Sequence, residues 1–238
     1  MFNRIITNPA LRSFFRRVGV LTWLKKFMGM RATAYEDRFA TALLGSIRKG
    51  DVVWDIGANV GFYTTQLARS VGPNGLVVAF EPVSTSFNRM VAAVKADGLN
   101  NVLPVQSALG HCEEKFSIPV TTVSDGVTNS LAKKTNTEGT CMEEITVSRG
   151  DKFIADGVPA PTIIKLDVEA YEEEVVFGLR SYLQGGCCRE LFCEIHFGQL
   201  AARGSAHAPR RIESLLLDSG YVVRWLDASH IQASRTLV

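Results

Sequence analysis

Short apolar runs, each the length of one buried strand, alternate with stretches of helical periodicity along residues 50–200. The expected strands are residues 52–56, 76–80, 102–105, 162–168 and 191–196, and the expected helices are residues 62–70, 84–97 and 171–183. Such alternation predicts an α/β fold, with a mostly parallel sheet and helices on both faces. In these sheets a ligand binds beyond the carboxyl ends of the strands, where the strand order reverses.

Composition agrees with one globular domain that carries an appendage. The chain has 238 residues, of which 46% are hydrophobic and 21% are charged, and these values exclude disordered and coiled-coil classes. Arg or Lys interrupts every apolar run before it reaches the roughly 18–20 residues that span a bilayer. The five cysteines are odd in number and form no C-x-x-C pair. We therefore expect reduced thiols and a cytoplasmic location.

Basic residues are concentrated near the N-terminus. Residues 1–49 hold ten Lys or Arg against two acids, whereas the remainder carries a net charge of −6. Apolar residues recur at helical spacing between these arginines, so we predict a basic helical extension over residues 1–48, followed by the main domain over residues 49–238. Two interpretations remain open for the extension: packing on the domain with a solvated basic face, or peripheral contact with a membrane surface or anionic ligand. Nucleic acid is not expected as a partner, because the charge excess is confined to one segment.

One polar stretch interrupts the α/β pattern. Residues 121–140 contain ten Ser, Thr or Asn, and the flanking residues 113–118 and 144–147 have the composition of strands. We predict an inserted β-hairpin over about residues 113–148. Its polar tip is either a lid on the substrate side or a plain surface loop.

A glycine-containing turn leads from the first expected strand into the first helix. The sequence Asp55-Ile-Gly-Ala-Asn-Val-Gly61 permits a tight bend and close approach of a ligand to the backbone. A dinucleotide fingerprint G-x-G-x-x-G would require glycine at two further positions, which are occupied by Asn59 and Phe62. The spacing therefore argues against a nicotinamide dehydrogenase.

Two acids stand at the ends of successive strands. Asp55 lies at the end of the first strand and Glu81 directly follows the second. Carboxylates accept hydrogen bonds from the hydroxyls of a ribose, and an acidic rim favours a cationic ligand over a phosphate. These two residues predict a site for a nucleoside without phosphates, such as the sulfonium compound S-adenosyl-L-methionine.

Charged residues also mark the ends of the fourth and fifth strands. Lys165, Asp167 and Glu169 alternate with apolar residues and so share one face, and Glu194 shares a face with His196. Buried charges must pair with each other or with a ligand, so a structural ion-pair network is the alternative to a catalytic role. The predicted catalytic residues are His196, Asp167, Lys165, Glu169 and Glu194.

His196 is the preferred proton acceptor, since an imidazole titrates near neutral pH; the alternative is a hydrogen-bonded structural histidine. Asp167, Glu169 and Glu194 also offer oxygen ligands of the kind that divalent metals bind. Such carboxylates bind sugar hydroxyls equally well. The sequence leaves the metal requirement open, as it does the oligomeric state.

Several motifs together resemble those of the FkbM family of S-adenosylmethionine-dependent methyltransferases. They cover roughly residues 50–200 and read, in order, DIGANVGFYT at 55–64, FEP at 80–82, Val147 with Asp151, IIKLDVE at 163–169 with Glu172, and EIH at 194–196. The resemblance implies a seven-stranded Rossmann-like sheet and O-methylation of a sugar, glycan or secondary-metabolite hydroxyl. The fourth family motif, D-x-E-G-A-E, has Ala170 and Tyr171 in place of Gly and Ala here. A bulkier turn at this point bears on the substrate rather than on the cofactor.

The resemblance also implies roles for individual residues. The residues expected to bind the methyl donor are Asp55, Gly57, Ala58, Asn59, Gly61, Tyr63, Glu81, Ser107 and Asp167. Asn59 and the turn amides would hold the methionine carboxylate, Glu81 the ribose, and residues 106–108 the adenine edge. Methylation of N or C in another small molecule, and a non-catalytic module that binds the donor, are the alternatives. The charged residues at the strand ends argue against the second of these.

Overall fold

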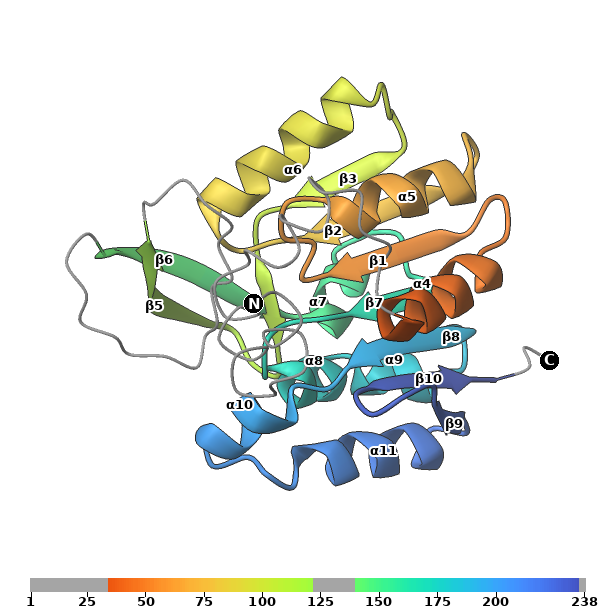
Figure 1. The fold of residues 1–238 in the computed structure, drawn as a ribbon, viewed down its shortest axis with the longest axis vertical. Helices are drawn as coiled ribbons and strands as arrows, with labels where there is room; N and C mark the ends of the chain where they lie inside the picture. Colours follow the sequence, from red (N-terminus) through yellow and green to blue (C-terminus); the bar gives the residue numbers. More distant parts are fainter. Residues whose placement is uncertain (1–33, 122–139, 236–238) are drawn as a thin grey trace, which may run out of the picture.

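The computed structural model describes residues 34–121 and 140–235, whose main element is a seven-stranded sheet in the order β3-β2-β1-β7-β8-β10-β9 (Figure 1). Its strands are β1 (Val52–Ile56), β2 (Leu76–Phe80), β3 (Val102–Val105), β7 (Ile163–Leu166), β8 (Glu190–Glu194), β9 (Val222–Trp225) and β10 (His230–Ser234). Every neighbouring pair is parallel except those that include β10. The prediction of a mostly parallel Rossmann-like sheet is confirmed.

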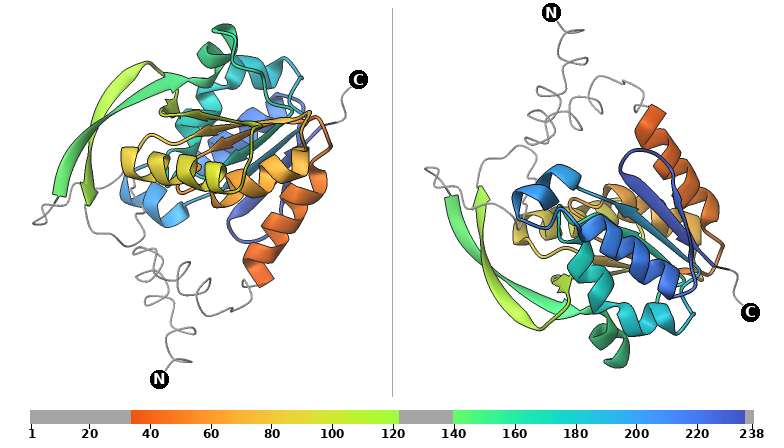
Figure 2. Two further views of the ribbon diagram at one scale, coloured as in Figure 1. Left: turned by 90° about the horizontal axis from the view of Figure 1, so that it is seen from above. Right: turned by 90° about the horizontal axis from the view of Figure 1, so that it is seen from below.

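Helices cover both faces of the sheet (Figure 2). One face carries α4 (Ala34–Ser46), α5 (Phe62–Val71) and α6 (Ser84–Ala96). The other carries α7 (Gly150–Ala155), α8 (Glu172–Gly178), α9 (Arg180–Gln184) and α11 (Ala208–Asp218). The short α10 (Phe197–Ala202) follows β8 at the carboxyl edge of the sheet.

The central strands β1, β2, β7 and β8 are buried on both faces, and the alternation of their side chains divides the core in two. In β1, Trp54 and Ile56 pack in the cluster beneath α8 and α11, whereas Val53 packs in the cluster beneath α4 and α5. Phe80 of β2 lies against Trp54, with ring centroids 4.8 Å apart. By the same alternation Asp55 points toward α5, away from the face of Ile56.

The predicted continuous helix over residues 171–183 is wrong, because it is divided into α8 and α9 at Leu179. Gly178 ends α8 where the chain packs against the backbone of Gly110, and a Cβ at this glycine would lie 1.8 Å from that carbonyl oxygen. Leu179 itself is fully buried. Tertiary packing therefore determines where the helix ends, although the periodicity of the sequence continues through it.

The insertion forms a second, three-stranded sheet. Its strands are β4 (Ala108–Gly110), β5 (Glu114–Thr121) and β6 (Thr140–Arg149), in the order β4-β6-β5. β5 and β6 are antiparallel, with Glu114 opposite Val147 and Ile118 opposite Glu143. They extend from the main body as a long twisted ribbon (Figure 2). The polar tip, for which a lid was one interpretation, lies in residues 122–139, outside the described residues.

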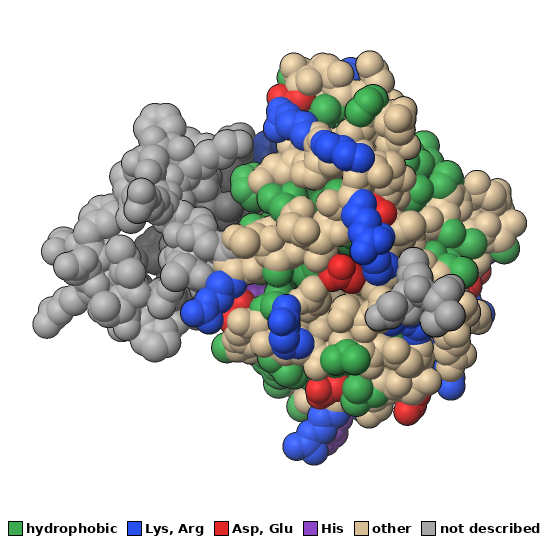
Figure 3. All heavy atoms as spheres, turned by 90° about the vertical axis from the view of Figure 1, so that its right-hand side faces the viewer, with side chains coloured by type: hydrophobic (Ala, Val, Ile, Leu, Met, Phe, Trp, Pro, Cys, Tyr) green, Lys and Arg blue, Asp and Glu red, His purple; other side chains and the backbone are tan. Residues whose placement is uncertain are grey.

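Most of the predicted basic extension, residues 1–33, also lies outside the described residues, and α4 forms the rest. Its contact with a membrane surface stays a prediction. None of the helices in the described ranges has both the length and the apolar character needed to cross a membrane. Figure 3 shows the edge of the sheet where the parallel strands begin, on which basic and acidic side chains are scattered rather than separated by sign.

Candidate functional site

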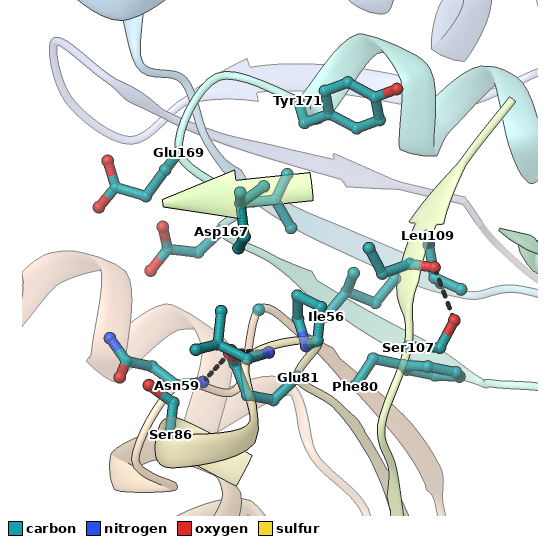
Figure 4. A pocket seen from close by; sticks show the side chains of 16 residues that line it. Ile56, Asn59, Phe80, Glu81, Ser86, Ser107, Leu109, Asp167, Glu169 and Tyr171 are labelled. Atoms are coloured by element: carbon teal, nitrogen blue, oxygen red, sulfur yellow. Dashed lines mark hydrogen bonds between the residues drawn. The ribbon is translucent and has the colours of Figure 1, made fainter. Parts of the chain in front are cut away.

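A cavity opens at the carboxyl ends of β1, β2 and β7, where the strand order reverses (Figure 4). It contains about 750 Å³ of empty space, a volume that includes the solvent at its open mouth. Its walls come from the turn after β1, the end of β2, the segment after β3, the hairpin strand β5 and the turn after β7. The predicted site residues among its lining are Gly57, Asn59, Glu81, Ser107, Asp167 and Glu169.

The turn after β1 is shaped by a close contact between two backbone segments. Gly57 has φ +80°, and a Cβ at this position would lie 1.8 Å from the carbonyl oxygen of Asp167. The N–H groups of Gly57 and Ala58 both donate to the carbonyl oxygen of Phe80, each at 3.0 Å. These amides are therefore engaged within the protein, which leaves the side chain of Asn59 and the first turn of α5 to face a ligand.

Glu81 lines the cavity with both of its carboxylate oxygens held by backbone hydrogen bonds. Its side chain accepts the N–H of Asn59 at Oε2 (2.9 Å) and the N–H of Val83 at Oε1 (3.0 Å). A carboxylate has about four acceptor positions, so each oxygen retains capacity for one further donor. Burial raises the pKa of Glu81 to about 7, although the two N–H groups act in the opposite direction.

Asn59 and Ser107 offer acceptors to a ligand. Asn59 has φ +50°, and its buried Oδ1 has no hydrogen-bond partner among the described residues. A ligand N–H would satisfy this oxygen, because an unpaired buried acceptor is costly. The hydroxyl of Ser107 is directed to the carbonyl oxygens of Ala108 (2.9 Å) and Thr146 (3.2 Å). Its proton is thus already donated, and only its lone pairs remain available to a ligand.

Asp55 and Lys165 form a buried ion pair beneath the turn rather than a wall of the cavity. They stand opposite each other on β1 and β7, and Lys165 Nζ lies 3.1 Å from Asp55 Oδ1. Thr64 donates to the other Asp55 oxygen at 2.7 Å, and Lys165 donates to the carbonyl oxygen of Gly57 at 3.0 Å. Burial alone would lower the pKa of Lys165, but the charges of Asp55 and Asp167 outweigh it and raise that pKa. Through the bond from Lys165 to Gly57, this ion pair stabilises the turn after β1.

Three further predicted donor-site residues lie around the same turn without lining the cavity. Ala58 is buried in the core cluster of α5. Gly61 has φ +85° and packs against Met90, 3.0 Å from the position of its absent Cβ. The Tyr63 ring lies 5.4 Å from Lys165 Nζ, in cation–π geometry.

The acceptor side is built around His196, which follows β8. Its Nδ1 lies 2.7 Å from Glu172 Oε1. Its Nε2 faces three carboxylates, at 3.7 Å from Asp167, 3.6 Å from Glu169 and 4.0 Å from Glu194. Burial lowers the pKa of His196, but the hydrogen bond to Glu172 and the neighbouring negative charges outweigh it and raise the pKa to about 10. The acids around this imidazole therefore favour its protonated form when no other cation lies among them.

Asp167 connects the donor and acceptor sides. Its backbone touches the glycine turn, whereas its carboxylate projects beside that of Glu169 toward the mouth of the cavity (Figure 4). Burial raises the pKa of Asp167 to about 6, in opposition to the charge of Lys165. Glu194 lies next to this group and also pairs with His230 at 3.4 Å.

Three residues that shape the site were not among the predicted site residues, although Glu172 was noted as part of a family motif. Glu172 is fully buried and accepts both from His196 and from the N–H of Ala170, at 2.8 Å. Gln199 of α10 donates to Glu169, and Ile118 of the hairpin lines the cavity. The position of Glu172, an acid just after the charged strand end, was a usable signal for its role. Nothing in the sequence pattern distinguishes Gln199 or Ile118.

Three comparisons place these features among known proteins. The model of the Methyltransferase FkbM domain matches residues 55–223. Over 158 residues the chain is 32% identical to the hexuronic acid methyltransferase AglP of Haloferax volcanii, a match that covers 66% of this chain and 60% of that protein.

Two solved structures show the same fold. Methyltransferase FkbM from Methylobacillus flagellatus aligns with TM-score 0.51 and 16% identity, over 80% of this chain and 45% of that one. A putative methyltransferase from Streptococcus mutans, in complex with SAH, aligns with TM-score 0.52 and 11% identity, over 86% of this chain and 99% of that one.

Proposed function

The chain belongs to the FkbM methyltransferase family, and from this premise we propose that it transfers a methyl group from S-adenosylmethionine to a hydroxyl of a sugar or glycan. The observation that carries the proposal is the single cavity wall shared by the glycine turn, Glu81 and Asp167. It brings acceptors for a ribose and for an ammonium group to one end of the cavity. The other end carries the carboxylates of Asp167 and Glu169, which can accept hydrogen bonds from the hydroxyls of an acceptor.

In the proposed donor complex, Glu81 accepts hydrogen bonds from the two ribose hydroxyls. Each of its oxygens already holds one backbone N–H and has room for one more donor. Asn59 Oδ1 accepts a hydrogen bond from the ammonium of the methionine part, which satisfies a buried atom that has no partner within residues 34–121 and 140–235. The methionine carboxylate lies at the first turn of α5, where unpaired N–H groups favour an anion. The adenine edge lies at Ser107. The hydroxyl oxygen of Ser107 can only accept a hydrogen bond from adenine, because its proton is already donated within the protein.

Asp55 and Lys165 have a supporting part in this proposal. Both are buried and face each other, so neither has a route to the ligand in the described structure. Lys165 Nζ also lies 3.7 Å from Asp167 Oδ2. Through this contact the pair fixes both the glycine turn and the carboxylate at the cavity mouth, so we assign them positioning roles.

The reaction is an in-line displacement. An oxygen lone pair of the acceptor forms the O–CH3 bond, while the C–S bond breaks and its electron pair stays on sulfur, which leaves S-adenosylhomocysteine. The main task of the site is alignment of the three atoms. The hydroxyl proton passes to Asp167 or to His196, and His196 can accept it only after losing its own Nε2 proton.

A sugar acceptor is supported by two separate points. The similar AglP is named as a methyltransferase of a hexuronic acid, although the match spans only 60% of that protein. In this chain Asp167 and Glu169 present carboxylate oxygens at the cavity mouth, and such oxygens accept hydrogen bonds from neighbouring hydroxyls of a sugar ring.

Incubation with a methyl-labelled donor and a panel of neutral, amino and uronic sugars, amines and phenols, read by mass spectrometry, tests the function. We expect a mass increase on an oxygen of at least one sugar. A product labelled on nitrogen or carbon would replace O-methylation by the corresponding reaction. Tight donor binding without product from sugars, amines or phenols would favour a non-catalytic module.

A further inference from the structure

The acceptor side contains a group of three side chains with the geometry of a metal site. Asp167, Glu169 and His196 each bring one oxygen or nitrogen atom within 4.8 Å of the others. We propose that these three residues bind one divalent cation of the Mg²⁺ or Mn²⁺ type. All three proposed ligands are described residues, and only the role of the ion in methyl transfer rests on the proposed function.

The distances fit a shared ion better than direct pairing. His196 Nε2 is 3.7 Å from Asp167 Oδ1 and 3.6 Å from Glu169 Oε2, both beyond hydrogen-bond distance. Atoms that bind one small cation at about 2.1 Å lie about 3–4 Å from each other. An ion between these atoms would therefore bind them with little movement of the side chains.

Each of the three side chains is oriented by a residue outside the group. The fully buried Glu172 accepts from Nδ1 of His196, and this bond turns Nε2 toward the carboxylates. Lys165 faces Oδ2 of Asp167, whereas the opposite oxygen, Oδ1, faces the imidazole.

The third orienting contact is a hydrogen bond from Gln199 to Glu169. A carboxylate on the second nitrogen of a histidine and hydrogen bonds on the carboxylates are the usual outer contacts of metal ligands. Such hydrogen bonds are present on His196 and Glu169, whereas Asp167 has only the charge of Lys165 beside it, at 3.7 Å. These contacts orient the side chains independently of the grouping itself.

The local charge also favours a dication. Asp167, Glu169 and Glu194 all lie within 4.0 Å of one imidazole nitrogen. Lys165 is shared with Asp55, to which it is nearer. Once Nε2 has lost its proton, as binding to an ion requires, the described residues place more negative than positive charge at this point.

Ligand type indicates which ion fits. Two carboxylates and one imidazole suit Mg²⁺ or Mn²⁺, and three protein ligands leave positions of an octahedron for water or for an acceptor hydroxyl. Another group of the described chain, His111, Cys112 and Glu114, contains a thiol and suits Zn²⁺ instead. The two groups therefore differ in the ions that they prefer. At the cavity mouth the first ion would lower the pKa of an acceptor hydroxyl.

The test is a titration of the full chain with Mn²⁺, without donor or acceptor, in which the six-line EPR signal reports unbound ion. We expect one bound Mn²⁺ per chain that is displaced by Mg²⁺. Glu169→Gln should weaken binding at least 10-fold, and the matched variant His111→Ala should leave it unchanged. No binding at millimolar Mn²⁺, or equal affinity of Glu169→Gln and the parent chain, would overturn the proposal.

Pulsed EPR of the unmodified Mn²⁺ complex adds a readout that needs no variant. A nitrogen-14 modulation from one bound imidazole is expected, and its absence would remove His196 from the site. Calorimetry with S-adenosylhomocysteine separates this inference from the proposed function. A chain that binds the nucleoside but fails to bind Mn²⁺ would contradict only the metal site, whereas a chain that binds Mn²⁺ but fails to bind the nucleoside would contradict only the proposed donor.

Discussion

Replacement of Glu81 by glutamine should remove a pH-dependent loss of stability and should weaken donor binding. The side chain keeps its size but loses its charge, and only one of its two terminal atoms can still accept a hydrogen bond. In the folded protein the pKa of Glu81 is about 7, against 4.5 for an exposed glutamate. This difference corresponds to about 3 kcal/mol of preference for the protonated form.

The sign of the effect on stability follows from proton linkage. Because the folded state binds this proton more tightly than the unfolded state, the stabilising contribution is complete below pH 4.5 and is lost as the pH rises to about 7. Glutamine does not titrate. The free energy of unfolding of Glu81→Gln, measured relative to the parent chain by urea denaturation, should therefore rise by about 3 kcal/mol between pH 4 and pH 8.

Donor binding should weaken in the same variant. At pH 8 the ionised carboxylate accepts two ribose hydroxyls, and charge-assisted bonds of this kind contribute about 1.5–3 kcal/mol. Calorimetry with S-adenosylhomocysteine should show a loss of that size in Glu81→Gln. Glu144→Gln, at an exposed carboxylate of the hairpin, is the control and should change neither quantity. Unchanged donor affinity, or a pH-independent stability difference, would refute the reasoning for Glu81.

Three other substitutions test the turns around the site. Ala170→Gly should raise the free energy of unfolding by about 1 kcal/mol in urea, because Ala170 has φ +78°, a conformation that favours glycine. Gly57→Ala should destabilise the chain and abolish nucleoside binding by calorimetry, since its Cβ would overlap the carbonyl oxygen of Asp167. Lys165→Met should lower the free energy of unfolding by about 3–5 kcal/mol, because Asp55 loses its ion-pair partner. The double variant with Asp55→Asn should recover most of that loss in a double-mutant cycle measured by thermal denaturation. Additive losses would contradict the pairing.

The central strands were predictable because their physical signal is continuous. β1, β2 and β3 have the predicted bounds. β1 and β2 are buried on both faces, and such parallel strands appear as unbroken apolar runs. β3 lies at the edge of the sheet and is partly exposed. β9 and β10 give no such signal. Val222 in β9 is 71% exposed, and β10 mixes polar and apolar residues. The full seven-stranded sheet was expected only from the family resemblance.

The site was predictable in position but not in detail. Asp55 and Glu81 were expected to line one ligand site together, whereas Asp55 faces Lys165 in the core. Because side chains alternate along β1, an acid one residue before the strand end points to the opposite face from Ile56, which lines the cavity. The contact between His196 and Glu172 depends on the left-handed conformation that follows Asp167. Period-two alternation does not describe such a turn.

A crystal structure of the full chain with S-adenosylhomocysteine tests most directly whether the carboxyl edge of β1 and β2 holds the methyl donor. The account predicts both ribose hydroxyls on the Glu81 carboxylate, the amino group at Asn59 Oδ1, and the sulfur directed toward Asp167. A nucleoside bound elsewhere, or one in this cavity whose ribose lies beyond hydrogen-bond distance of Glu81, would contradict it.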